Sequence, residues 1–191
     1  HSDRLDATAG RRANHWLEAQ HPERALDPLL TAIERFSQDG GYRSSEELLE
    51  QRTALIEELD LPDEDPRRIE NLIARARQHA AAARPAAALE TLDTAWKSAR
   101  SGEHLELIGR ANLYRGRVLT GAGRLGEAFD ALDKAERAFR QTGDRSGIAQ
   151  ALLARGNHLQ STQQDYEQAE ASLRGARRIF EQIDDGYYEA I

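Results

Sequence analysis

The stretches ANLYRGRVL (residues 111–119) and GRLGEAFDALDKAERAF (residues 123–139) decide the fold, because the chain repeats both of them. The first returns as ALLARGNHL (residues 151–159), and the second returns as QDYEQAEASLRGARRIF (residues 164–180). The copies lie 40 to 41 residues apart, and apolar residues recur within them every three or four positions. A repeat of this length with helical spacing is typical of stacked helical hairpins. We therefore predict an all-α fold, a right-handed superhelical array of antiparallel helix pairs with about nine helices and the start of a tenth.

Small residues occupy equivalent positions in the repeated helices. In the first helix of each pair, Ala76, Gly116 and Gly156 are expected where the two helices approach most closely. Glycine inside a helix costs about 1 kcal/mol relative to alanine, so two glycines at one equivalent position indicate a packing reason. In the second helix the small positions are Ala88, Ala128 and Ala169, then Ala95, Ala135 and Ala176, with Leu92, Leu132 and Leu173 between them. This shared alternation predicts that all three pairs pack in the same way.

A proline-containing acidic turn, LPDEDP (residues 61–66), divides the chain. It places Asp65 at the N-cap of the next helix, where a carboxylate accepts hydrogen bonds from free backbone N–H groups, and Pro66 at the first helical position. Before this turn, residues 1–60 are predicted to form an N-terminal lead-in of about three helices with degenerate repeats. After it, the predicted repeats cover residues 67–99, 102–140 and 144–183, with a truncated copy at 184–191.

Within the lead-in, the segment SSEELLEQRTALIEEL (residues 44–59) is predicted to be one helix. Ser44 and Glu47 have the spacing of a capping box, in which each side chain accepts a hydrogen bond from a free backbone N–H group at the helix start. The apolar face of this helix is expected to consist of Leu48, Leu49, Ala54, Leu55 and Leu59.

The alternation of small and large residues resembles that of the tetratricopeptide repeat (TPR) family. The matching residues are Gly116, Leu119, Ala128, Leu132 and Ala135 in one copy, and Gly156, Leu159, Ala169, Leu173 and Ala176 in the next. The repeats are longer than the usual length of about 34 residues in that family. The resemblance implies a TPR-like α-solenoid that binds a partner along its concave face. It does not imply the family's clamp for a C-terminal carboxylate, because the positions of that clamp carry Ile73, Arg77, Tyr114, Gln150 and Ala154.

Residues 11–59 are similar to the helical segment that follows the nucleotide-binding module in bacterial signal-transduction ATPases of the STAND class. Related arrays occur beside serine/threonine kinase modules and in large transcription activators. This second resemblance implies the sensor or regulatory arm of a larger signalling protein. The chain begins at His1 and contains no methionine, so we expect it to be a piece of such a protein. A free-standing repeat protein is the alternative.

The composition argues against several classes of function. The formal net charge of −7 is unlike the clustered positive charge of a nucleic-acid-binding surface. The sequence has no cysteine, which excludes disulfides, thiol catalysis and cysteine-based zinc sites. No apolar run has the length of a membrane span. We therefore expect a cytoplasmic protein with no cofactor and with neither nucleic acid nor a membrane as a direct partner.

No motif in the sequence is typical of an enzyme. Residues 121–126 spell G-x-G-x-x-G, but a dinucleotide-binding fingerprint follows a strand, and here a predicted helix precedes the motif. The six histidines are not spaced as metal ligands, and no pair of carboxylates with a cleft is indicated. We therefore predict a protein without enzymatic activity.

The candidate partner-binding residues lie on the predicted concave wall. This wall is formed by the first helix of each pair, and its candidates are Arg77, Arg110, Tyr114, Arg117 and Asn157. Arginines on one wall of an acidic chain can bind an acidic or carboxylate-bearing segment through charge-assisted hydrogen bonds, although they can also be ordinary solvated helix residues. We favour a non-catalytic protein–protein interaction or regulatory scaffold module that binds a protein or peptide partner. The alternative is the ligand-sensing arm of a STAND ATPase, a kinase or a transcription regulator. We also consider a dimer through an exposed terminal repeat.

Overall fold

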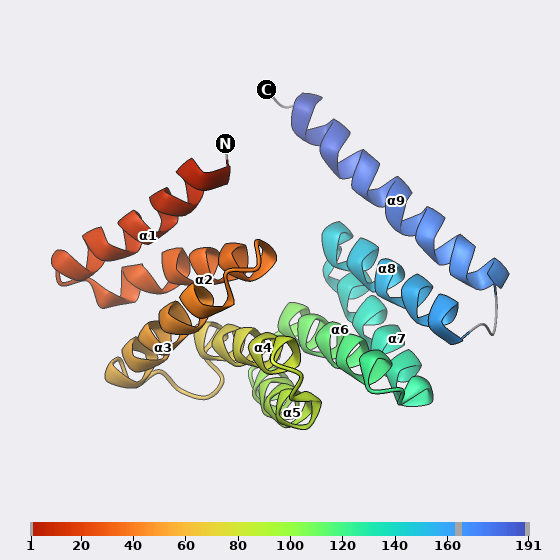
Figure 1. Cartoon of the computed structure of the whole chain (residues 1–191), viewed down its shortest axis with the longest axis horizontal. Helices are drawn as coiled ribbons and strands as arrows, with labels where there is room; N and C mark the ends of the chain where they lie inside the picture. The colour runs from red at the N-terminus through yellow and green to blue at the C-terminus, as the bar shows by residue number, and fades with distance from the viewer. Residues whose placement is uncertain (1, 163–165, 190–191) are drawn as a thin grey trace.

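The computed structural model describes the backbone of residues 2–162 and 166–189 and the side chains of residues 9–160 and 166–183. This part of the chain contains nine α-helices and no strand, which confirms the predicted all-α class (Figure 1). The helices are α1 (Ser2–Glu18), α2 (Pro22–Gln38), α3 (Tyr42–Glu58), α4 (Pro66–Ala81), α5 (Pro85–Ser101), α6 (Leu105–Gly121), α7 (Leu125–Thr142), α8 (Arg145–Thr162) and α9 (Tyr166–Glu189).

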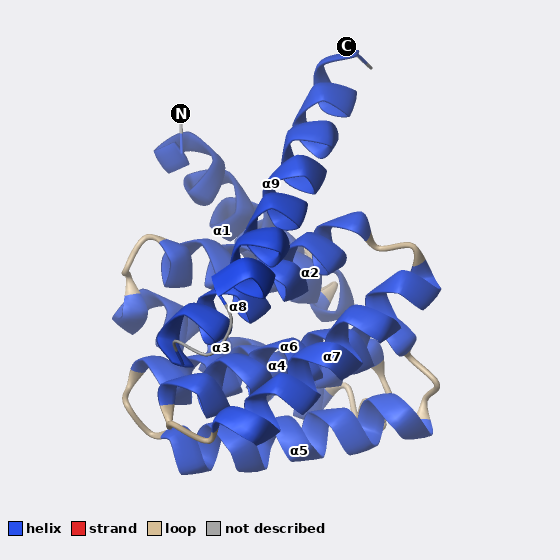
Figure 2. Ribbon diagram, turned by 90° about the vertical axis from the view of Figure 1, so that its right-hand side faces the viewer, coloured by secondary structure: helices blue, strands red, loops and turns tan. Residues whose placement is uncertain are grey.

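Each helix packs against the next one in the chain, and α2, α4, α6 and α8 also contact one another in sequence. These four helices therefore form a continuous row, and the remaining helices pack beside it. The whole array is a solenoid with the outline of a crescent. The first turn of α1 and the last turn of α9 lie on the same side of it (Figures 1 and 2).

The two repeated glycines lie where the helices approach most closely, as predicted. A Cβ atom on Gly116 in α6 would lie 2.6 Å from the side chain of Leu132 in α7 and 3.3 Å from the carbonyl oxygen of Ala128. A Cβ atom on Gly156 would lie at the same distances from Leu173 and from the carbonyl oxygen of Ala169. The pairs α6–α7 and α8–α9 therefore repeat the same packing at this point, which explains the glycine at both positions.

The start of α4 agrees with the sequence-based prediction, but the start of α3 does not. The Asp65 carboxylate accepts a hydrogen bond from the backbone N–H of Arg67 at 2.9 Å, and Pro66 is the first residue of α4. By contrast, α3 begins at Tyr42 with Gly41 at its N-cap, so Ser44 is an exposed residue within the helix and the predicted capping box is wrong. The reason is that the chain reverses at Gly40, whose φ is 80°, so the helix can start directly after Gly41, before Ser44 is reached.

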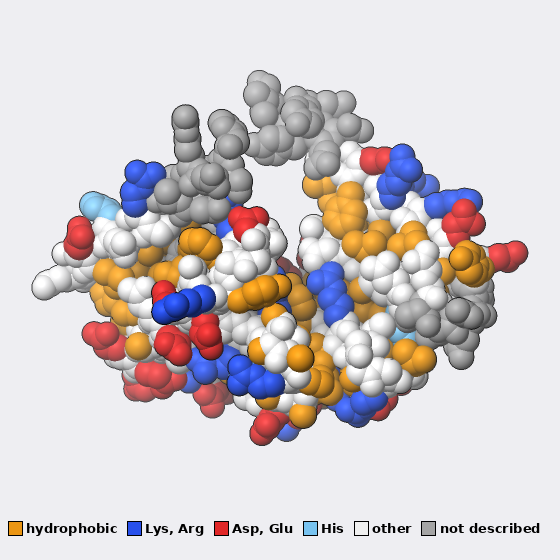
Figure 3. Space-filling view, viewed as in Figure 1, with side chains coloured by type: hydrophobic (Ala, Val, Ile, Leu, Met, Phe, Trp, Pro, Cys, Tyr) orange, Lys and Arg blue, Asp and Glu red, His pale blue; other side chains and the backbone are white. Residues whose placement is uncertain are grey.

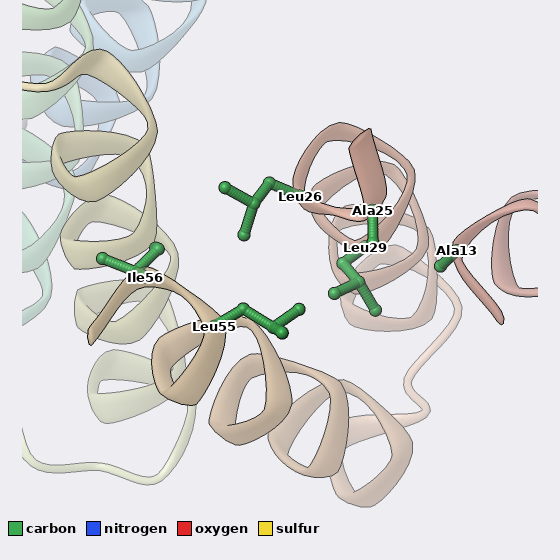
Figure 4. Packing of buried hydrophobic residues seen from close by; sticks show 6 residues of the cluster. All are labelled: Ala13, Ala25, Leu26, Leu29, Leu55 and Ile56. Atoms are coloured by element: carbon green, nitrogen blue, oxygen red, sulfur yellow. The ribbon is translucent and has the colours of Figure 1, made fainter. Parts of the chain in front are cut away.

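The buried face of α3 also differs from the expected one, because it contains two polar residues. Its buried residues are Ser45, Leu49, Arg52, Leu55 and Ile56, whereas Ala54 is exposed. Leu55 and Ile56 join Ala13, Ala25, Leu26 and Leu29 in the core of the lead-in (Figure 4). Of the five residues predicted for the apolar face, only Leu49 and Leu55 are therefore buried. The buried face is the one that contacts α2 and α4.

Arg52 has a fully buried side chain and joins three helices. Its guanidinium donates hydrogen bonds to the carbonyl oxygens of Leu26 at 3.0 Å and Arg67 at 2.8 Å, and to Asn71 Oδ1 at 3.1 Å. Burial lowers the pKa of Arg52 to about 10, and the nearby carboxylate of Glu70 opposes this shift. Because these bonds connect α3 to both α2 and α4, the lead-in packs continuously onto the repeats.

The predicted tenth helix does not begin within the described residues. Residues 184–189 are the last turns of α9, which runs without interruption from Tyr166 to Glu189. Between α7 and α8 the chain turns at Gly143, whose φ of 72° suits glycine. One repeat later this position holds Asp184, which lacks the same freedom, and the helix continues. The side chains of residues 184–191 lie outside the described residues.

Candidate functional site

A groove of about 610 Å³ lies where the last turns of α4 and α6 meet the first turns of α3 and α5. Its charged lining residues are Arg77 and Arg117, and its aromatic ones are Tyr42 and Tyr114. Most of the other lining residues are alanines and other small or apolar residues, and no acidic residue lines the groove. We call it the basic groove. Figure 3 shows Lys or Arg side chains beside hydrophobic ones along the edge of the notch between the two arms of the crescent.

The Tyr114 ring holds the two arginines of the basic groove. The guanidinium carbon of Arg77 lies 5.1 Å from the ring centroid, and that of Arg117 lies 5.2 Å from it. Tyr114 and Arg117 are one turn apart on α6, whereas Arg77 comes from α4. Contacts of this length between a guanidinium and an aromatic ring are attractive cation–π contacts. The ring of Tyr114 therefore fixes two cations at the same wall of the groove.

Arg117 is the more available of these two cations. Its side chain is exposed, and it forms no ion pair with a carboxylate among the described residues. Burial of part of the guanidinium lowers the pKa of Arg117, the neighbouring Tyr114 opposes this shift, and the charge of Arg77 adds to it. A guanidinium has five N–H donors, so Arg117 can contact Tyr114 and still donate to a carboxylate or another anion.

A second hollow of about 370 Å³ adjoins the basic groove and shares Arg77 and Tyr114 with it. Here Glu34 of α2 accepts a hydrogen bond from Arg110 at 3.1 Å, and its same oxygen lies 3.8 Å from Arg77. Arg110 also contacts Glu70 at 3.4 Å. Burial raises the pKa of Glu70, and the charges of Arg110 and Arg52 oppose this shift. We call this second cavity the paired hollow, because its arginines already face carboxylates.

The structure brings four of the five predicted site residues together. Arg77, Arg110, Tyr114 and Arg117 lie in the two adjoining cavities, whereas Asn157 is exposed on α8 and lines neither of them. Helix α8 instead contributes Ser146, Gly147 and Gln150 to the paired hollow. Among these four residues, the Arg110 guanidinium already lies between two carboxylates of this chain.

Sequence reasoning missed two residues of the site, Tyr42 and Glu34. Tyr42 is 58% exposed and lines the groove from the start of α3. The only signal in the sequence is that this aromatic residue directly follows Gly40 and Gly41. Glu34 lies in the lead-in, where the degenerate repeat gives no register that would place it opposite Arg110. No pattern in the sequence could have identified that contact.

Among the described residues, no group of three or more His, Cys, Asp or Glu side chains is arranged to hold a metal ion. The described helices also include none that is long and apolar enough to cross a membrane. The arrangement that the structure does show is suited to binding an anion beside an apolar surface.

Solved structures match this fold, whereas neither a protein-family model nor a curated protein matches the chain. PlcR of Bacillus thuringiensis, in complex with the peptide PapR7 and DNA, matches 99% of this chain and 69% of its own with a TM-score of 0.79 and 14% identity. BtubC of P. vanneervenii matches 95% of this chain and 74% of its own, with a TM-score of 0.72 and 16% identity. The nearly identical TPR-like repeats of a Podospora anserina protein described as a kinesin light chain match 96% and 98%, with a TM-score of 0.57 and 18% identity. These similarities show a TPR-like fold.

Proposed function

We propose that this chain is a non-catalytic protein-interaction or regulatory module whose basic groove binds an acidic segment of a partner protein. The main support for this proposal is the charge of the residues that line the groove. In a chain of net charge −7, the groove is lined by two arginines and by no acidic residue. Such local positive charge favours an anionic partner and directs its approach.

The size and lining of the basic groove suit a short segment of a partner. Ligand-binding cavities usually have volumes of about 300–1,000 Å³ and combine an apolar lining with a few polar groups. The groove has about 610 Å³, with Arg117 as a cation and alanines as apolar surface. A carboxylate can accept two hydrogen bonds from one guanidinium, while a neighbouring apolar side chain covers the alanines. The match to PlcR, whose structure contains a bound peptide, supports a peptide partner for this fold.

The test compares Arg117→Gln with Arg100→Gln in binding to a fluorescein-labelled, terminally blocked peptide that alternates leucine and glutamate. Both residues are exposed arginines next to an aromatic ring, since Arg100 lies 5.0 Å from the Trp96 ring, but Arg100 does not line the groove. Loss of a hydrogen bond to a charged group costs about 1.5–3 kcal/mol, so Arg117→Gln should weaken binding roughly tenfold or more. Arg100→Gln should bind as the wild type does.

Either of two results would contradict the proposal. One is equal affinity of Arg117→Gln and wild type for the acidic peptide. The other is equal affinity of the wild type for the acidic peptide and for a peptide in which glutamine replaces every glutamate. Arg110 is unsuitable for this test, because its substitution removes contacts with Glu34 and Glu70 and changes the packing of α2, α4 and α6.

The second candidate function is the ligand-sensing arm of a larger signalling protein, such as a STAND ATPase, a kinase or a transcription regulator. The volume of the basic groove favours it, since about 610 Å³ also suits a small carboxylate ligand. Titration with citrate and succinate distinguishes the two candidates, because a sensor should bind a small carboxylate as tightly as it binds the acidic peptide. A nucleotide-binding or kinase module in the same polypeptide would also favour the sensor.

A further inference from the structure

We propose that Glu34 is an internal competitor of the acidic partner, and that its carboxylate lowers the affinity of the basic groove for anionic segments. This inference rests on the proposed function, since it concerns the same arginines. Glu34 projects from α2 and reaches arginines on two other helices, Arg77 of α4 and Arg110 of α6. Its carboxylate is the same chemical group that the partner is proposed to offer.

Arg77 can face either of the two adjoining cavities. It lines the basic groove beside Arg117, and it also lines the paired hollow opposite Glu34. Its distance of 3.8 Å from Glu34 exceeds the length of a hydrogen bond, whereas Arg110 donates to the same oxygen at 3.1 Å. Arg77 can therefore turn toward a ligand carboxylate while Glu34 keeps its stronger contact with Arg110.

The position of Glu34 opposes a bound anion in two ways. Its negative charge partly neutralises Arg77. A ligand carboxylate that binds Arg77 must therefore weaken the attraction between Arg77 and Glu34. The charge of Glu34 also repels a second carboxylate nearby. The Glu34 side chain is 35% exposed, so water and ions weaken both effects without removing them. A neutral segment in the groove would experience neither effect, so Glu34 influences selectivity for charge as well as affinity.

Glu70 provides a matched control. It contacts Arg110 at 3.4 Å, as Glu34 does at 3.1 Å, but it also contacts the buried Arg52 at 3.4 Å and lines neither cavity. Replacing Glu70 should lower the stability of the fold, because a buried arginine loses its carboxylate. It should leave Glu34 and Arg77 in place, so the affinity for an acidic peptide should stay close to that of the wild type.

The experiment measures the affinity of wild type, Glu34→Gln and Glu70→Gln for the alternating leucine–glutamate peptide and for its leucine–glutamine counterpart. Glu34→Gln should bind the acidic peptide about two- to fivefold more tightly than wild type, the factor expected for one pair of partly exposed charges. Its affinity for the neutral peptide should be unchanged, and its gain should shrink as salt is added. Glu34→Asp keeps the negative charge but places it farther from Arg77, because its side chain is shorter. It should therefore bind the acidic peptide more tightly than wild type, but by a smaller factor than Glu34→Gln.

The outcomes separate this inference from the proposed function. If wild type binds the acidic peptide and Glu34→Gln binds it equally or more weakly, Glu34 is only a structural ion-pair partner. The proposal that Glu34 competes with the acidic partner is then wrong. An equal gain in Glu34→Gln and Glu70→Gln would likewise overturn it, since any lost partner of Arg110 would then suffice. If wild type shows no preference for the acidic peptide, the proposed function itself is wrong.

Discussion

At Gly116, a missing side chain determines how closely two helices can pack. A methyl group there would meet Leu132 at 2.6 Å and the Ala128 carbonyl oxygen at 3.3 Å. Overpacking of this kind costs about 1–3 kcal/mol, and the better helix propensity of alanine returns about 1 kcal/mol. We expect Gly116→Ala to lower the free energy of unfolding by about 1 kcal/mol, as measured by urea denaturation.

The same helix offers a control for this substitution. A Cβ atom on Gly121 would meet nothing within 4 Å, so Gly121→Ala should leave the stability unchanged or raise it slightly. Gly156→Ala should cost as much as Gly116→Ala, because its neighbours lie at the same distances. If Gly116→Ala were as stable as Gly121→Ala, close packing would not explain the repeated glycine.

The sequence predicts individual residues well only where the repeat provides a register. The two glycines and their partner leucines follow from comparing one copy with the next. The contact between Arg110 and Glu34 joins residues 76 positions apart, one of them in the degenerate lead-in, so no such comparison exists. Arg52 was missed for a different reason. Its burial depends on hydrogen-bond acceptors in α2 and α4. The spacing of apolar residues in the sequence gives no information about these acceptors.

At the scale of one element, the start of α4 depends on the ionised form of Asp65. Its carboxylate accepts from the Arg67 backbone N–H at 2.9 Å and from the Arg67 guanidinium at 2.7 Å and 2.9 Å. The hydrogen bonds from the Arg67 side chain are the main reason that the pKa of Asp65 lies below its usual value of 3.8. The stabilisation is therefore complete above about pH 3.8 and is lost as the pH falls through the lower pKa of the folded state.

The substitution Asp65→Asn tests this dependence on charge. Asparagine still caps a helix, so the variant removes the charge and its pairing with Arg67 while retaining the cap. We expect it to be less stable by about 0.5–1 kcal/mol at pH 7, with the difference from wild type disappearing as the pH falls through the lowered pKa of Asp65 in the folded state. Asp63→Asn is the control, because Asp63 is 82% exposed and lies 3.9 Å from Arg68. A difference for Asp65→Asn that persisted unchanged at low pH would contradict the role of the charge.

At the scale of the whole molecule, the repeat predicts the row of α4, α6 and α8 but not the ends of the array. The three lead-in helices α1 to α3 were expected, but the polar contacts that Glu34 of α2 and Arg52 of α3 make with α4 were not. Both cavities include residues of the lead-in, Ser37 and Tyr42 in one and Glu34 and Gln38 in the other. The candidate site therefore exists only where the lead-in joins the repeats.

Binding of an acidic segment beside Arg77, Tyr114 and Arg117 can be mapped directly by NMR of the arginine side chains. The Nε–H resonances of the arginines can be followed while the alternating leucine–glutamate peptide is added. We expect the Arg77 and Arg117 resonances to shift. Those of Arg100 and Arg24 should stay unchanged, because these two arginines lie beside Trp96 and Trp16 outside the groove. Shifts confined to Arg100 or Arg24, or a bound peptide that leaves Arg117 unshifted, would contradict binding at this site.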